Sequence, residues 1–490
     1  MSKQKKLDSE TRQFFKLLAD VIFSNPFSFD KKMIEDVIGR TIDEQSDEHH
    51  YLALMPFLKM HLDKLDAQGI NSIATVNVKD KVLLEYAYRF EVYHEYVDEF
   101  EELIKRQLAQ GSEPVTVWFA KPLIKQLINR GLSEEDALRN LALFYQLRRA
   151  YYFIEQSLSG NAPCMQHLRH SLWNHVFTYD VRLYVDHLWD RMEDFSTLLL
   201  GETGTGKGTA AAAIGRSGLI PFDIKKGCFS TSFTETFVAI NLSEFSENLI
   251  ESELFGHRKG AFTGAIDHYK GLFERCSKNG SLFLDEIGDV AVPIQIKLLN
   301  VLQDRYFTPV GSHESHRFEG RVIAATNQSL DDLRQQGLFR DDFYYRLSSD
   351  VIEVPTLRQR LRETPSELCQ LVDLLLLRLT GKRSDSLTNK IMDSLSLNLP
   401  KDYAWPGNVR ELEQAVRSII LSGEYKTAIN ISEEENDWLS QVPCGQITAQ
   451  DLLAHYCNML YSQTGTYEEV SEITDMDRRT VKKYIEMVNK

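Results

Sequence analysis

Residues 195–214 read FSTLLLGETGTGKGTAAAAI, and this stretch decides the fold of the middle of the chain. The apolar run Phe195–Leu200 predicts a buried strand, and the Ala-rich run Thr209–Ile214 predicts a helix. The glycine-rich loop between them ends in Lys207. This order favours a phosphate cradle over an ordinary turn, because backbone N–H groups and the positive end of the helix dipole converge on the anion.

The loop supplies the candidate nucleotide ligands, and we expect Lys207 to reach the β- and γ-phosphates. Gly208 stands where such loops carry the Ser or Thr whose hydroxyl binds Mg²⁺, so Thr209 or water would have to substitute. The expected nucleotide-binding residues here are Gly201, Glu202, Thr203, Gly204, Thr205, Gly206, Lys207, Gly208 and Thr209.

An acidic pair, Asp285-Glu286, ends a second apolar run. We expect Asp285 to hold Mg²⁺, with Thr209 as the other candidate metal ligand, and Glu286 to polarise the attacking water. Asn327 ends a third strand-like run and would lie near the γ-phosphate. An ordinary strand-end Asn that starts a turn is an equal alternative.

Three arginines are candidates for charge stabilisation at the phosphates. Arg340 and Arg346 lie in a partly apolar segment, where they could form surface ion pairs or reach the nucleotide of a neighbouring subunit. Arg410 lies in the first turn of a predicted helix and could touch phosphate from a helical lid.

Strand-like runs at Phe237–Ile240, Ser281–Leu284 and Arg321–Ala325 alternate with helical stretches. This alternation predicts an α/β domain with a largely parallel sheet at about 165–360. A helical piece is predicted at 361–425.

Residues 1–160 are predicted to be mainly helical. A helix starts at Ser133, and the aromatic stripe Tyr86, Phe90, Tyr93, Val97 and Phe100 has the spacing of one helix face. Short β-like runs are expected at Ala74–Val78 and Val115–Phe119. Cys164, His167, His170 and His175 have near-helical spacing and could bind a metal, although a partly exposed polar helix face is favoured.

The 490-residue chain has a net charge of −15, so any nucleic-acid contact must come from a local basic patch. No apolar run is long enough to span a bilayer, and no signal peptide is evident. The six cysteines form no CxxC pair, which suits reduced thiols. We therefore expect a cytoplasmic protein of two to four domains without a membrane partner.

The stretch ESELFGHRKGAFTGA at residues 251–265 resembles the AAA+ domain of bacterial enhancer-binding proteins, the activators of sigma-54 transcription. The resemblance covers about residues 165–425. It implies an α/β AAA+ P-loop domain at 165–360 with an α-helical lid at 361–425, binding ATP and Mg²⁺. Two positions depart from the family pattern: Gly208 stands where Glu is frequent, and Arg258 where Glu is usual.

The resemblance assigns roles by matching position. Asp285 and Glu286 correspond to the Walker B pair, and Asn241 to the residue that restrains the catalytic Glu. Asn327 resembles sensor I, Arg340 and Arg346 resemble fingers acting on the neighbouring subunit, and Arg410 resembles sensor II.

The loop GAFTGA is the family's contact with sigma-54, and by resemblance Phe262 and Thr263 would make that contact. The residues of this loop are Gly260, Ala261, Phe262, Thr263, Gly264 and Ala265. The resemblance also implies a ring oligomer, expected to be a hexamer, that hydrolyses ATP to remodel sigma-54 RNA polymerase.

The last segment predicts a helix-turn-helix at 451–490 behind an acidic linker at 426–450. Residues 477–490 hold five Lys or Arg and two Asp or Glu, which gives a local charge of +3. A helix pair used only for dimerisation is the alternative. The expected contacts with promoter-upstream enhancer DNA are Arg478, Arg479, Thr480, Lys482 and Lys483.

Three functions are compatible with these features. The first is an ATP-driven activator of sigma-54 transcription. The second is a nucleotide-gated DNA-binding regulator with weak hydrolysis, which Gly208 favours. The third is an AAA+ remodeller of another partner. The sequence does not identify the signal or ligand of the expected regulatory region 1–160.

Overall fold

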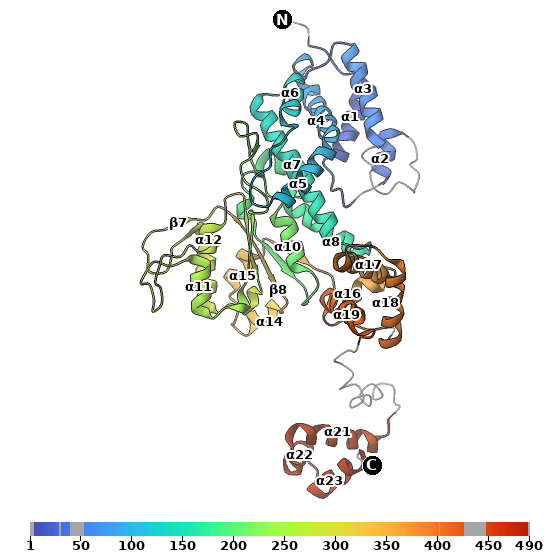
Figure 1. The fold of residues 1–490 in the computed structure, drawn as a ribbon, viewed down its shortest axis with the longest axis vertical. Coiled ribbons are helices and arrows are strands. Elements are labelled where there is room, and N and C mark those ends of the chain that lie inside the picture. Colours follow the sequence, from blue (N-terminus) through green and yellow to red (C-terminus); the bar gives the residue numbers. More distant parts are fainter. Residues whose placement is uncertain (1–3, 29–30, 40–52, 401, 426–446, 489–490) are drawn as a thin grey trace. The chain divides into compact units, whose positions relative to one another are not determined.

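The computed structural model describes residues 4–28, 31–39, 53–400, 402–425 and 447–488. The chain divides into two compact units (Figure 1). One contains Met1–Thr388 and Tyr403–Gln414, and the other contains Asn389–Asp402 and Ala415–Lys490. Most of the linker predicted at 426–450 lies outside the described residues.

A five-stranded parallel sheet is the centre of the first unit, with strand order β4-β5-β8-β1-β9. Its strands are β1 Thr197–Leu200, β4 Phe237–Asn241, β5 Ser281–Asp285, β8 Arg321–Thr326 and β9 Asp350–Glu353. The predicted α/β fold and its four strand-like runs are confirmed. The strand β9 was not predicted, because its half-exposed DVIE segment lacks a continuous apolar run.

Side chains alternate between the two faces of the sheet, and each face has its own core. Leu198, Leu282 and Val322 belong to the core on one face. Leu199, Phe283 and Ile323, each one residue later, belong to the core on the other. The α-helices that lie between β1 and β9 in the chain are α10 Lys207–Gly215, α11 Glu247–Phe255, α12 Leu272–Arg275, α13 Val292–Asp304, α14 Leu330–Gln335 and α15 Asp341–Leu347. Two small antiparallel pairs are added, β2 Phe222–Asp223 with β3 Cys228–Phe229, and β6 Tyr306–Phe307 with β7 His316–Arg317.

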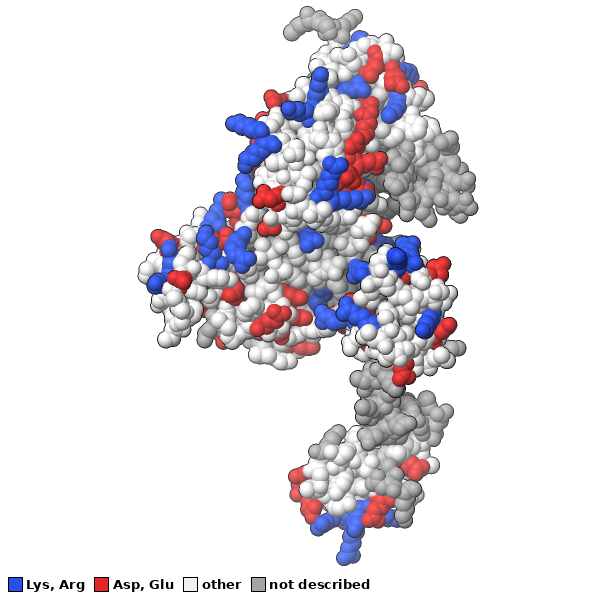
Figure 2. All heavy atoms as spheres, viewed as in Figure 1, with Lys and Arg blue, Asp and Glu red and all other residues white. Residues whose placement is uncertain are grey.

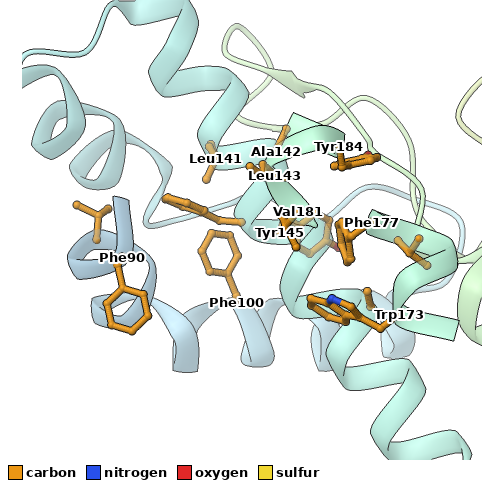
Figure 3. Close-up of a cluster of buried hydrophobic side chains, with 14 of the residues drawn as sticks. Phe90, Phe100, Leu141, Ala142, Leu143, Tyr145, Trp173, Phe177, Val181 and Tyr184 are labelled. Carbon is orange, nitrogen blue, oxygen red and sulfur yellow. The ribbon is translucent and has the colours of Figure 1, made fainter. Parts of the chain in front are cut away.

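In the described residues between 4 and 177, the α-helices are α1 Ser9–Ile22, α2 Lys31–Ile38, α3 Met55–Ala67, α4 Val78–Glu95, α5 Val97–Gln110, α6 Ala120–Asn129, α7 Glu134–Ser157 and α8 Pro163–Phe177. We call residues 4–157 the head. Its apolar side chains share one buried core with Leu199 and with α10 residues such as Ala211. Figure 3 shows part of this core, where Tyr145 of α7 lies beside Phe100 of α5. The boundary expected at residue 160 therefore falls inside a continuous core.

The start of α7 at Ser133 is confirmed, because the Ser133 hydroxyl accepts a hydrogen bond from the Asp136 N–H at 3.0 Å. Two other expectations for the head were wrong. The aromatic stripe does not lie on one helix, since Tyr96 leaves the helical conformation at φ −116° and ψ 15° and separates α4 from α5. The β-like runs form isolated bridges only, Val76 with Lys5 and Thr116 with Cys228, because no longer strand lies beside them.

The lid helices follow β9: α16 Leu357–Glu363, α17 Glu367–Thr380, α18 Asp385–Asn398 and α19 Asn408–Ser422. A buried ion pair joins Arg360 to Glu367. Both side chains also hold the connector between α7 and α8. Arg360 donates to the Ser159 carbonyl at 2.6 Å, and Glu367 accepts from the Ala162 N–H at 3.0 Å.

His175 ties α8 to the amino-terminal edge of the sheet. Its Nδ1 lies 2.8 Å from Asp350 Oδ2, and its Nε2 contacts Thr197 and Arg321. The expected exposed polar face is therefore wrong for His175, which is buried because it links three strands to α8. Among the described residues, no group of three His, Cys, Asp or Glu could hold a metal ion.

The second unit ends in three helices, α21 Ala449–Thr464, α22 Tyr467–Thr474 and α23 Arg478–Val488. They enclose a small core of Cys457, Leu460, Val470, Val481 and Ile485. None of the helices that the structure describes is long and apolar enough to cross a bilayer.

The buried imidazole of His175 predicts a pH-dependent stability. Burial, helped by the nearby Arg321 cation, lowers the pKa of His175 to about 4. In the unfolded chain an ordinary histidine has a pKa of about 6.5, so between about pH 6.5 and 4 the unfolded state binds more protons. We expect the free energy of unfolding to fall by up to about 3 kcal/mol over this range because of His175 alone.

Denaturant unfolding at pH 7 and pH 4.5 measures this component as the difference between wild type and His175→Gln. The exposed His313 provides the matched control, His313→Gln. An equal pH dependence in wild type and His175→Gln would contradict the expectation.

Candidate active site

The phosphate loop leaves the carboxyl end of β1 and enters α10. Gly204 and Gly206 have φ values of +79° and +103°, a region that side chains other than glycine rarely adopt. Gly204 has a second constraint, since a Cβ there would lie 2.2 Å from the Gly407 carbonyl oxygen. The close approach of the lid therefore excludes a side chain at this position.

Lys207 begins α10 and is buried. Its Nζ donates to the carbonyls of Gly201 at 2.7 Å and Glu202 at 3.2 Å. Burial lowers the pKa of Lys207, while the carboxylates of Glu286 and Asp285 oppose that shift. The lysine charge and both carboxylates thus belong to one electrostatic site.

Asp285 ends β5, and burial raises the pKa of its carboxyl group although Lys207 opposes the shift. Glu286 has a left-handed backbone with φ +54°, a strain of about 1–3 kcal/mol for a residue other than glycine. One carboxylate oxygen of Glu286 accepts from the Asn327 N–H at 3.2 Å. Asn327 Nδ2 in turn donates to the Thr203 hydroxyl at 2.7 Å. The ends of β5 and β8 therefore meet the phosphate loop, as the sequence predicts.

Asn241 pairs with Asp285 in the register of β4 and β5. Its side-chain oxygen accepts from the N–H of Ser243 at 3.1 Å and from the Ser243 hydroxyl at 2.9 Å. In this conformation Asn241 caps the short helix Leu242–Glu244. Its restraint on Glu286 stays a prediction.

Gly208 and Thr209 are exposed in the first turn of α10. A Cβ on Gly208 would meet only Phe283 Cε1, at 3.9 Å, so the position has room for a side chain. The donor set fits a magnesium nucleotide, because Asp285 offers a carboxylate oxygen beside the lysine and the loop N–H groups. Asp285 and Thr209 would be the protein ligands of bound Mg²⁺, which would neutralise phosphate charge there.

Two residues without a role predicted from sequence, Asn408 and Arg358, bind the lid to the phosphate loop. Asn408 is fully buried with φ +51°, and its Nδ2 donates to the Thr203 carbonyl at 3.0 Å and to Glu202 at 3.1 Å. Arg358 forms an ion pair with the same Glu202. The left-handed turn before Arg410 was visible only as Trp-Pro-Gly-Asn, a pattern that predicts a turn but not its partner.

Arg410 lies in the first turn of α19, where its charge adds to the lowering of the Lys207 pKa by burial and opposes the rise that burial causes in the Asp285 pKa. The other two arginines lie elsewhere. Arg340 pairs with Asp342 at 2.7 Å, and Arg346 donates to the Leu302 carbonyl at 2.8 and 2.9 Å. In the described part of the chain, neither of these two side chains hydrogen-bonds its own phosphate loop.

The loop after α11 is a tight, exposed structure. Gly260 and Gly264 have φ values of +81° and +106°, and the Gly260 N–H donates to the Ala265 carbonyl at 2.8 Å. Phe262 is 41% exposed, with its ring edge-to-face against His257 at 4.9 Å. Thr263 is also exposed, whereas Ala265 is buried. Ala261 packs against Gly311 of the β6–β7 connection, which supports the base of the loop.

The basic residues of α23 stay on the surface of the second unit. Figure 2 shows Lys and Arg side chains grouped on this unit. Arg478 pairs with Glu468 at 2.6 Å and Lys482 with Glu486 at 3.8 Å, while Arg479 and Lys483 are exposed. The Thr480 hydroxyl donates to Asp477, the residue that caps α23.

The open position at Gly208 yields a test of magnesium binding. We expect Gly208→Ser to lower the Mg²⁺ concentration for half-maximal ATP binding several-fold, because the hydroxyl would supply the missing ligand. Titration of Mg²⁺ at fixed ATP measures this change. Gly208→Ala is the matched control, since it adds the same Cβ and helix propensity without the hydroxyl. Equal effects of Ser and Ala would contradict magnesium ligation.

Comparison with known proteins places these residues in a family. The Sigma-54 interaction domain matches residues 186–353. The chain is 42% identical to a Nif-specific regulatory protein of Azotobacter vinelandii, over 46% of this chain and 40% of that protein. It is 40% identical to a DNA-binding transcriptional regulator NtrC of Rhizobium meliloti, over 51% of this chain and 47% of that protein. The chain thus spans less than half the length of these two relatives.

A third relative is covered more fully. The Sigma54-dependent transcriptional activator SfnR of Pseudomonas putida is 38% identical over 283 residues, which are 56% of this chain and 71% of SfnR. Residues 186–353, which match the Sigma-54 interaction domain, include the phosphate loop, the acidic pair and the exposed GAFTGA loop described above. This chain belongs to the family of sigma-54-dependent transcriptional activators.

Proposed function

We propose that this protein activates sigma-54 transcription by hydrolysing ATP in a ring, expected to be a hexamer. The observation that carries the proposal is an exposed GAFTGA loop on the same α/β domain as an assembled nucleotide site. The partners are sigma-54 RNA polymerase, promoter-upstream DNA and further copies of this chain, in the cytoplasm.

In this mechanism Lys207 and the loop N–H groups bind the phosphates of ATP. Glu286 polarises the attacking water, and the Asn327 N–H orients its carboxylate at 3.2 Å. Arg410, at the start of the lid helix α19, contacts phosphate and stabilises its charge. Arg340 and Arg346, whose hydrogen bonds go to Asp342 and to the Leu302 carbonyl, act on the neighbouring subunit's nucleotide.

The output of hydrolysis is a movement of the GAFTGA loop. Phe262 offers an apolar surface and Thr263 a hydroxyl, and both are exposed. The two left-handed glycines allow a tight bend that can be reshaped without strain on side chains. These properties suit a contact with sigma-54 that forms and breaks during the cycle.

The second unit would bind DNA through α23 as the recognition helix of a helix-turn-helix. Its support is the α22–α23 pair around Val470 and Val481, with exposed basic side chains on α23.

A nucleotide-gated regulator with weak hydrolysis is the second candidate. One observation favours it: Gly208 supplies no hydroxyl to Mg²⁺, and the next hydroxyl, Thr209, is exposed in the following position. The two candidates differ in whether Glu286 turns over ATP.

Two substitutions separate ATP hydrolysis from sigma-54 binding. We expect Glu286→Gln to bind ATP but to lose about 10²- to 10⁴-fold in hydrolysis rate, because the amide cannot act as a base. We expect Thr263→Ala to keep hydrolysis and to lose sigma-54 binding in the presence of a transition-state nucleotide analogue. Steady-state ATPase rates and pull-down of sigma-54 measure the two effects.

Equal hydrolysis by wild type and Glu286→Gln would support the nucleotide-gated regulator instead. Normal sigma-54 engagement by Thr263→Ala would point to another partner for the loop. ATPase activity that does not rise with protein concentration would count against the ring.

DNA binding has its own test in α23. We expect Lys482→Ala and Lys483→Ala each to weaken binding of duplex DNA and to reduce the salt-dependence slope by about 1, if each lysine contacts a phosphate. Lys390→Ala, an exposed lysine in α18, is the control. Unchanged slopes for both α23 variants would favour a helix pair used for dimerisation.

A further inference from the structure

Two buried side chains of α7 bind the chain where it leaves the end of α10. Arg149 donates from Nη1 to the Arg216 carbonyl and from Nη2 to the Gly218 carbonyl, both at 2.6 Å. Gln146 donates to the carbonyl between them, that of Ser217, at 2.9 Å. The head thus binds three consecutive carbonyls behind the phosphate-binding helix.

The burial of Arg149 makes its hydrogen bonds sensitive to the position of the two acceptor carbonyls. The side chain is 0% exposed, and burial lowers its pKa to about 10, so it stays charged at neutral pH. Its terminal nitrogens hydrogen-bond carbonyl oxygens, and its guanidinium lies over the rings of Tyr145 at 4.5 Å and Phe233 at 5.8 Å. A buried cation without its acceptors is costly, so the two carbonyls must stay in place.

The carbonyls belong to residues 216–218, which directly follow α10 at the negative end of its helix dipole. Lys207 lies at the other end of the same nine-residue helix. At a rise of about 1.5 Å per residue, this helix is only about 13 Å long. A shift of its C-terminal end is therefore transmitted to Lys207 and to the N–H groups that face phosphate.

Other contacts fix the head to the segment that follows α10. The rings of Tyr145 and Phe229 stack at 4.1 Å. The hydroxyls of Ser232 and Thr234 donate to the Gly111 carbonyl at 2.8 and 2.9 Å. Tyr184 fixes Gln146 through a hydrogen bond of 2.9 Å, and Figure 3 shows Tyr184 and Tyr145 in the same buried cluster.

We propose that Arg149, assisted by Gln146, is a positioning residue for nucleotide binding: the head sets the affinity for ATP by holding the C-terminal end of α10. Arg149 touches neither substrate nor reacting atoms and acts through the helix. The inference rests on the proposed function for its physiological meaning, since an ATP-driven activator needs a path from its head to its nucleotide site.

The test compares Arg149→Met with Arg148→Met. Arg148 is the adjacent arginine, and it pairs within the head, with Glu101, and lies over Tyr151 at 5.5 Å. We expect Arg149→Met to weaken ATP binding and raise KM about five- to twentyfold, with kcat changed less than about threefold. Arg148→Met should leave ATP affinity within about twofold of wild type. Arg149→Lys, which keeps the charge, should recover part of the loss.

Hydrogen exchange adds a readout that general destabilisation would not reproduce. By the reciprocity of linked binding, saturating ATP should slow exchange in α7 of wild type and of Arg148→Met, but not of Arg149→Met. Isothermal titration with a slowly hydrolysed ATP analogue measures affinity on the full chain without relying on turnover.

Unchanged ATP affinity in Arg149→Met would overturn the proposal, as would an equal loss in Arg148→Met. Should Arg149→Met fail to fold, Arg149→Lys and Gln146→Met decide the question, and normal affinity in both overturns it. A wild type that binds ATP but does not hydrolyse it would defeat the proposed function and leave this binding test intact.

Discussion

The hydrogen bonds from Asn408 to Thr203 and Glu202 hold the lid on the phosphate loop, and the geometry of the nucleotide site depends on them. They form because the turn before α19 adopts a left-handed backbone that brings Gly407 against Gly204. A side chain on Gly204 would collide with the Gly407 carbonyl and separate the two subdomains. The glycines of the loop therefore serve both phosphate approach and lid contact.

The helix that begins at Lys207 is consequently held at both ends. The lid contacts the loop at its N-terminal end, and Arg149 of the head binds the chain at its C-terminal end. The lid residue Arg358 pairs with Glu202, while Arg360 of the same helix α16 binds the Ser159 carbonyl of the connector from the head. Head, lid and phosphate loop are thus joined through short chains of hydrogen bonds and ion pairs.

The sequence predicted the strands of the central sheet better than the contacts that join the head and the lid to the phosphate loop. The strands ending in Leu200, Asp285 and Thr326 were readable because each contains a continuous apolar run that stops at a glycine or a polar residue. Residues that directly follow parallel strands lie at the same edge of the sheet. The contact between the Asn327 N–H and the Glu286 carboxylate therefore follows from the order of the strands and motifs along the chain. The break at Tyr96 was not predictable, because the helical spacing of the aromatic residues continues through it. The contacts of Arg149 and Asn408 were hidden because three of their four acceptors, those of Arg216, Gly218 and Thr203, are backbone carbonyls, which carry no sequence pattern.

One further connection relates the nucleotide site to the exposed loop. Asn241 lies beside Asp285 in the sheet and caps the short helix Leu242–Glu244, which leads directly into α11. The other end of α11 is Phe255, and Gly256 there opens the segment that carries Phe262. That segment is paired on both sides, by His257 with Tyr269 and by Gly256 with Val310. A change in the partner of Asn241 would therefore displace one rigid helix, whose far end is braced against two backbone neighbours. Gly260 and Gly264 lie beyond this braced base, so such a displacement would be directed to the tip of the loop and would not be absorbed in its stem.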